Sequence, residues 1–191
     1  MKDLDFFPLS LTTKGNFANL LNKGYPNYQF FDKPDYYDLY INLNLAFAMY
    51  DFYLLLTNPL QTDFLSMVLH HSATISLIVF SHICCYSAFG CIINYIMFIG
   101  DVFSYIVRVA IHANVPNLLS SIATFVFIVV YSYTRLYIFG YEIIYTMYHG
   151  LAYSNIFEIS SIVFLFLILL LNILWITMIT KKYINYLQTG N

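Results

Sequence analysis

The chain has 191 residues, of which 60% are hydrophobic, 20% aromatic and 9% charged. A soluble domain carries about 25% charged residues, so this composition excludes a soluble enzyme and a disordered chain. The mean hydropathy of +0.69 instead predicts a polytopic membrane protein. The net charge of −2 leaves no basic surface for a nucleic acid partner.

The first 38 residues differ from the rest of the chain, because half of all charged residues precede Leu39. Prolines and glycines interrupt this segment, which favours an irregular arm on the membrane surface. It lacks the basic stretch and apolar core of a secretory signal, and it has acids and no Arg, unlike a mitochondrial presequence. We therefore predict an interfacial or soluble N-terminal arm, 1–38, followed by a transmembrane domain, 39–187.

Five apolar runs follow the arm, and each approaches the roughly 20 residues that cross a bilayer as a helix. They cover residues 40–57, 64–85, 89–111, 118–148 and 156–179. Asn58-Pro59, Pro116 and Lys181-Lys182 mark three of the ends. The runs are long and continuous, which favours helices over the short alternating strands of a barrel. The sequence therefore predicts an all-α membrane protein of about five transmembrane helices.

The second run carries paired histidines at membrane depth, where ionisable groups are costly and usually face a bundle interior. The spacing i, i+4, i+7 and i+11 places four residues on one helix face: His70, Thr74, Leu77 and Ser81. His71 points about 100° away from His70 by the helical period.

The third and fourth runs each hold an acid and an arginine seven residues apart, which an α-helix places on one face. The pairs are Asp101 with Arg108, and Arg135 with Glu142. We expect Asp101 to meet His70 or His71, because a carboxylate beside an imidazole fixes its tautomer and raises its basicity.

Purely structural roles for these groups stay open. A His–Asp contact in a membrane bundle can act as interhelical glue. Arg108 can neutralise Asp101, and Arg135 can neutralise Glu142. A metal ion held by His70, His71 and Asp101 is disfavoured, because adjacent histidines lie on different helix faces. We therefore predict neither a metal nor a cofactor.

The order of these residues resembles a known motif. His70-His71, followed by Thr74, Leu77 and Ser81, is similar to the HHxxTxxLxxxS start of the motif of ceramide synthases, a branch of the TLC-domain family. Single residues match at four further positions of the family pattern. Asp51 matches an Asp upstream of the histidines, Gly90 the motif glycine, Asp101 the last Asp of HDxxD, and Arg108 the terminal basic position. Residues 134–139 are similar to a TRLxIF-like stretch, and residues 168–187 are similar to the last helix of the family. The resemblance covers roughly residues 47–187.

The resemblance implies a bundle of membrane helices around a long cavity that admits an acyl chain. It also implies acyl transfer from acyl-CoA, as substrate, to the amine of a sphingoid base. The implied catalytic residues are His70, His71 and Asp101, with Thr74, Ser81, Arg108 and Arg135 in support. Imidazole suits such a role, because it is a good nucleophile and general base near neutral pH.

The sequence also departs from the motif. HDxxD reads Met97-Phe98-Ile99-Gly100-Asp101 here, and Tyr105 replaces the following Glu. Replacing polar groups with Met and Phe makes the site drier and less able to stabilise charge, and the polar arm stands where the family has one or two membrane helices. Loss of catalytic groups typically costs several orders of magnitude in rate, whereas a fold can persist without its activity.

Three functional hypotheses follow. The first is a catalytically degenerate TLC-type protein that binds lipid or serves as an accessory subunit of a membrane complex, with membrane lipids and other subunits as partners. The second is an active, divergent sphingoid-base N-acyltransferase. The third, a transporter, has no inverted repeat or broken helix pair in its favour. The resemblance indicates the endoplasmic reticulum, and the mitochondrial inner membrane is the alternative.

Overall fold

The computed structural model describes residues 36–58, 63–83, 87–113, 115–150 and 156–189, and each element in these ranges is a helix. Five of the helical stretches within these ranges are long and apolar enough to cross a membrane. The structure therefore confirms the predicted all-α class with five spans, and the protein is a multi-pass integral membrane protein. The predicted arm lies outside the described residues, apart from its last three, which begin the first membrane helix.

The helices follow the predicted runs with shifts at their ends. They are α2 (Tyr36–Thr57), α3 (Phe64–Ile83), α4 (Ser87–His112), a fourth stretch made of α5 (Asn117–Tyr131), η2 (Ser132–Ile144) and α6 (Tyr145–Gly150), and α7 (Ile156–Thr189). The predicted end of the second run, near residue 85, lies outside the described residues. α7 continues past Lys181-Lys182, because lysines that must leave the hydrocarbon can still occupy a helix in the headgroup region.

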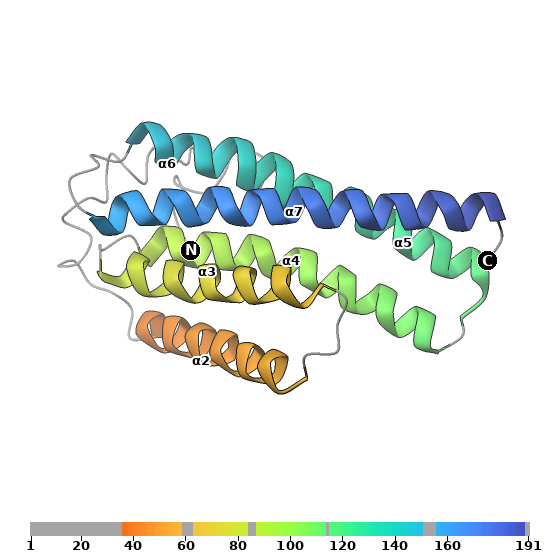
Figure 1. Cartoon of the computed structure of the whole chain (residues 1–191), viewed down its shortest axis with the longest axis horizontal. Helices are drawn as coiled ribbons and strands as arrows, with labels where there is room; N and C mark the ends of the chain where they lie inside the picture. Colours follow the sequence, from red (N-terminus) through yellow and green to blue (C-terminus); the bar gives the residue numbers. More distant parts are fainter. Residues whose placement is uncertain (1–35, 59–62, 84–86, 114, 151–155, 190–191) are drawn as a thin grey trace.

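The five spans run alternately up and down the bundle (Figure 1). α3 packs against both α2 and α7, and α4 packs against the fourth stretch, which also contacts α7. α2, α4 and α7 finish at one end of the bundle, which we call the C-terminal end. At this end α4, α5 and α7 extend past α2 and α3 (Figure 1).

The helix that begins at Asn117 starts where a proline forbids continuation of the previous helix. Pro116 occupies its N-cap, with φ −46° and ψ 137°, and offers no side-chain cap. Its carbonyl accepts hydrogen bonds from the backbone N–H groups of Leu119 and Ser120, at 2.9 and 3.1 Å. At the end of α2, the carbonyl of Leu54 accepts hydrogen bonds from the backbone N–H and the side-chain amide of Asn58. The end of α2 and the start of α5 therefore lie at the helix-breaking residues Asn58 and Pro116.

The fourth stretch contains a long π-helical segment, η2, which the sequence analysis did not anticipate. Buried residues recur along it as neighbouring pairs every four or five positions: Thr134-Arg135, Ile138-Phe139 and Ile143-Ile144. This period is wider than the 3.6 residues of an α-helix and fits hydrogen bonds from residue i to i+5. At its start, the Thr134 hydroxyl donates to the Val130 carbonyl at 2.8 Å, a bond that competes with the α-helical ladder.

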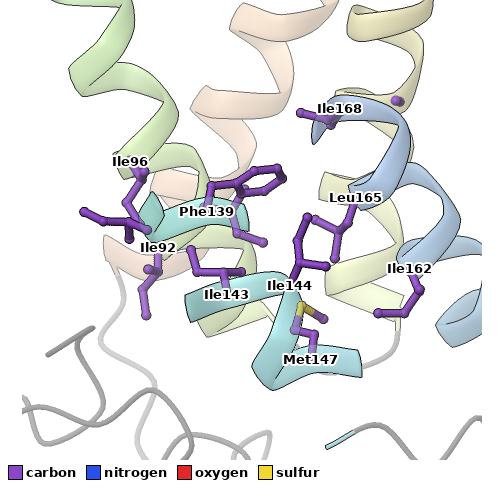
Figure 2. Close-up of a cluster of buried hydrophobic side chains, with 12 residues drawn as sticks. Ile92, Ile96, Phe139, Ile143, Ile144, Met147, Ile162, Leu165 and Ile168 are labelled. Carbon is purple, nitrogen blue, oxygen red and sulfur yellow. The ribbon is translucent and has the colours of Figure 1, made fainter. Parts of the chain in front are cut away.

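The main hydrophobic core lies where η2 and α6 meet α4 and α7. Figure 2 shows Ile92 and Ile96 of α4 beside Phe139 and Ile143, with Leu165 of α7 close by. These side chains are nearly or fully buried. The core therefore packs η2 against both α4 and α7, and it fixes the position of Arg135, which precedes Phe139 by one turn.

Candidate functional site

A mostly apolar pocket, which we call the inner pocket, lies among α2, α3, α4, α6 and α7 and has a volume of about 150 Å³. The predicted face of α3 lines it: His70, Thr74, Leu77 and Ser81. His71, Ala48 of α2 and Met97 and Phe98 of α4 complete much of the wall. The structure thus confirms that the four spaced residues of α3 share one interior face.

A second and more polar pocket, the central pocket, has a volume of about 570 Å³ and lies toward the C-terminal end of the bundle. It shares four lining residues with the inner pocket: Asp51, His70, His71 and Asp101. Arg108, Tyr131, Arg135 and Trp175 line its other walls. The two pockets therefore meet at the histidines and the two aspartates.

Arg135 is the centre of the polar network. Its side chain is 2% exposed and forms an ion pair with Asp101, whose side chain is 53% exposed and lines both pockets. The same guanidinium donates to the Met97 carbonyl at 2.8 Å and to Oδ1 of Asn172 at 3.4 Å. The guanidinium carbon lies 5.2 Å from the centre of the Tyr131 ring. Because arginine stays charged, this site needs the Asp101 carboxylate as its counter-charge.

The pairing of Asp101 with Arg135 differs from one expectation and from two of the structural alternatives. No hydrogen bond or ion pair joins Asp101 to His70 or His71 in the described part of the chain. Arg108 makes no ion pair with Asp101 among the described residues, and its guanidinium carbon lies 5.9 Å from the Tyr105 ring centre. Arg135 does not pair with Glu142, because residues seven apart share a face in an α-helix but not in the wider π-helix that contains them.

His70 lies against aromatic rings rather than carboxylates. Its ring centroid is 5.1 Å from that of Trp175 and 5.6 Å from that of His71, both edge to face. Nδ1 of His70 is buried and has no hydrogen-bond partner. On the other side, His71 lies 6.3 Å from the Phe52 ring. Nothing among the described residues fixes the tautomer of His70.

Three further buried nitrogens close to this point also have no partner. They are Nε of Arg135, Nδ2 of Asn172 and Nε1 of Trp175, all of them N–H donors. A buried donor without an acceptor costs about 1–3 kcal/mol, so this cluster favours an occupant that brings acceptor oxygens. Water or the carbonyl or hydroxyl of a ligand satisfies that requirement.

The supporting residues are divided between the pockets. Thr74 and Ser81 line the inner pocket, whereas Arg108 and Arg135 line the central one. The Ser81 hydroxyl donates to the Ile78 carbonyl at 2.8 Å, which leaves it only its acceptor lone pairs for a ligand. Among the described residues, no group of three or more His, Cys, Asp or Glu side chains is placed to hold a metal ion.

Asn172 is a site residue that the sequence analysis missed. It is fully buried, and its Oδ1 accepts from the Tyr131 hydroxyl at 3.0 Å as well as from Arg135. A signal was present, because Asn172 is the only amide in the apolar run 156–179. A polar side chain in such a run usually faces the bundle interior.

Gly100 leaves space for the Arg135 side chain, because a glycine has no Cβ atom there. A Cβ atom at Gly100 would lie 2.9 Å from Nε of Arg135. Gly100→Ala is therefore expected to displace the guanidinium and to lower the free energy of unfolding by about 1–3 kcal/mol, measured by titration with SDS in mixed micelles. Gly140→Ala is the matched control, since its Cβ would meet only the tip of the Leu169 side chain, with Cδ1 at 3.1 Å and Cδ2 at 3.7 Å, and this flexible tip can move. Equal losses in the two variants would contradict the assignment of Gly100 to Arg135.

The helices and the pockets together define a multi-pass membrane protein with an internal cavity that is apolar at one end and polar at the other. The TLC domain matches residues 7–181, so the chain belongs to the TLC domain family, a family of lipid-related membrane proteins. The match begins inside the segment assigned to the N-terminal arm, and the division at residue 38 stays a prediction. No curated protein and no solved structure matches the chain.

Proposed function

We propose that this protein is a ceramide synthase-like member of the TLC domain family that binds lipid in its cavity and is catalytically degenerate. The observation that carries the proposal is that Asp101 is engaged by buried Arg135, while Nδ1 of His70 has no partner. A histidine that acts as nucleophile or general base relies on a group that orients its ring and stabilises its charged form. The described residues offer His70 no such group.

The wall of the inner pocket supports the same conclusion. Met97 and Phe98 stand where the resembling motif has a histidine and an aspartate, and both line this pocket. They give an acyl chain an apolar surface but give a developing charge no hydrogen bond. The pocket therefore suits the hydrocarbon part of a lipid better than it suits a reaction centre.

An accessory role in a membrane complex is the second part of the proposal. Tyr133, Tyr137, Tyr141 and Tyr145 form an exposed stack along the fourth stretch, with successive ring centroids 5.7, 5.8 and 6.0 Å apart. Such a column of rings suits contact with lipid or with a neighbouring subunit. The resemblance favours the endoplasmic reticulum for this role, with the mitochondrial inner membrane as the alternative.

The test measures bound lipid and product formation in one preparation. The full chain is purified in mild detergent, and its lipids are extracted and quantified by mass spectrometry. We expect wild type to retain lipid in fixed proportion, and we expect Ala48→Trp and Met97→Trp, which fill the inner pocket from two helices, to lose most of it. Leu43→Trp, an exposed position on α2, is the control and keeps the lipid.

Activity is then measured with acyl-CoA and a sphingoid base. One observation favours the alternative of an active N-acyltransferase, since His70, His71 and Asp101 all line both pockets. We expect no amide product above a protein-free control. Product that forms with wild type and disappears in His70→Ala would overturn the proposal of a degenerate site, whereas lipid retained equally by all variants would overturn lipid binding in the cavity.

A further inference from the structure

A third pocket, the outer pocket, lies at the C-terminal end of the bundle among α4, α5 and α7 and has a volume of about 690 Å³. It shares five lining residues with the central pocket: Ser104, Arg108, Phe127, Ile179 and Lys182. The inner, central and outer pockets therefore adjoin one another in series along the bundle.

The described lining of the outer pocket carries positive charge. Arg108 and Lys182 line it, and no Asp or Glu is among the described residues that do. Neither cation makes an ion pair in the described part of the chain, although Asp51 and Asp63 line the neighbouring central pocket and Asp101 is bound to Arg135. The site therefore presents two positive charges to whatever enters from the C-terminal end.

Hydroxyl groups line the same pocket as these two cations. Ser121 and Tyr183 hydrogen-bond to each other at 3.0 Å across α5 and α7, and one of their two hydroxyl protons stays available to a ligand. Arginine and lysine together with hydroxyl donors are the groups that bind phosphate oxygens in proteins.

The outer pocket also lies at the depth of lipid headgroups. α7 has 34 residues, or about 51 Å at the rise of an α-helix, against a hydrocarbon core of about 30 Å. Lys182 lies 26 residues after the start of α7 at Ile156, and about 39 Å of helix separates the two. If Ile156 enters the hydrocarbon, Lys182 is past its other boundary, which is where the phosphates of a bilayer lie.

The three pockets thus place three chemistries in one order. The inner pocket is mostly apolar, the central pocket is more polar and is lined in part by Arg135 and Trp175, and the outer pocket is cationic. The inner pocket is narrow, because a cavity of about 150 Å³ holds a molecule the size of benzene. It therefore has room for part of one hydrocarbon chain and not for two chains side by side.

We propose that the cavity binds a single-chain phospholipid from the bilayer, with the end of its chain in the inner pocket, its ester beside Arg135 and Trp175 in the central pocket, and its phosphate between Arg108 and Lys182. This inference rests on the proposed lipid-binding function and names the class of lipid. The occupant carries a negative charge, which distinguishes it from a sphingoid base or a ceramide.

The experiment measures binding of oleoyl lysophosphatidic acid to the full chain in nanodiscs by native mass spectrometry. Mono-oleoyl glycerol has the same chain and ester but no phosphate, and oleoyl-CoA and inorganic phosphate supply phosphate from solution. We expect lysophosphatidic acid to bind wild type at least about tenfold more tightly than mono-oleoyl glycerol, because only its phosphate can form charge-assisted hydrogen bonds with Arg108 and Lys182. Arg108→Gln with Lys182→Gln removes this preference, whereas Arg108→Lys with Lys182→Arg keeps it.

Lys181→Gln is the matched control, because it removes the same charge one residue away, at a position that lines neither the central nor the outer pocket. We expect it to keep the preference for lysophosphatidic acid. Equal binding of the two oleoyl lipids to wild type would overturn the phosphate site but not lipid binding in the cavity. Lipid binding in the cavity would be overturned separately if Met97→Trp bound both lipids as well as wild type does. Inorganic phosphate or oleoyl-CoA could instead be the ligand of Arg108 and Lys182. If their binding depended on these two residues and that of lysophosphatidic acid did not, the bilayer lipid would be overturned as the occupant.

Discussion

Asp101→Asn is expected to lower the free energy of unfolding by about 3 kcal/mol, because it leaves the charge of Arg135 buried without a counter-charge. The Arg135 side chain is 2% exposed, and its remaining bonds go to the uncharged acceptors Met97 and Asn172. The measurement is unfolding by SDS in mixed micelles, followed by circular dichroism.

The partner substitution separates this charge effect from a loss of packing. In an Arg135→Met background no buried cation remains, so Asp101→Asn is expected to cost only about 1 kcal/mol there. The double-mutant cycle then gives a coupling of about 2 kcal/mol between the two residues. Additive losses would mean that the ion pair contributes nothing to the fold, and the central role given to Arg135 would be wrong.

Phe139→Ala is expected to produce the other large effect, a loss of about 3–5 kcal/mol in the same assay. Phe139 is fully buried among Ile96, Ile143 and Leu165, where truncation leaves a cavity that neither lipid nor solvent reaches (Figure 2). Phe166 on α7 provides the control, because its side chain is 43% exposed on the outer surface.

Truncation at Phe166 lets lipid chains or detergent fill the space that the ring leaves. We expect Phe166→Ala to change the free energy of unfolding by no more than about 0.5 kcal/mol. If both variants lost the same stability, burial in the core would not explain the effect, and the packing of η2 against α4 and α7 would have to be reconsidered.

The spans were predictable from the sequence because the bilayer sets both their length and their composition. Runs of apolar residues bounded by Asn58 and Pro116 marked helix ends that the structure reproduces within a few residues. The end of α7 was harder to predict, since Lys181 and Lys182 mark where the chain leaves lipid rather than where the helix stops.

The sequence predicts which residues line the site, but it does not predict which of them pair with one another. The spacing of His70, Thr74 and Ser81 fixes a shared face on any α-helix, and the structure places them in one pocket. The partner of Asp101 depends on the rotation of a neighbouring helix, and the π-helical segment changes that rotation. Sequence periodicity assumes 3.6 residues per turn, so it placed Arg135 beside Glu142 instead of Asp101.

Trp175 gives the cavity a natural optical reporter. It is the only tryptophan in the chain, and its indole lies against His70 at the boundary between the apolar and the polar part of the cavity. Light absorbed at the red edge of the protein spectrum excites tryptophan without the tyrosines, so the emission comes from one known position. The colour and intensity of that emission follow the polarity around the indole, and entry of a ligand can therefore be timed in the unmodified protein without a dye or a label.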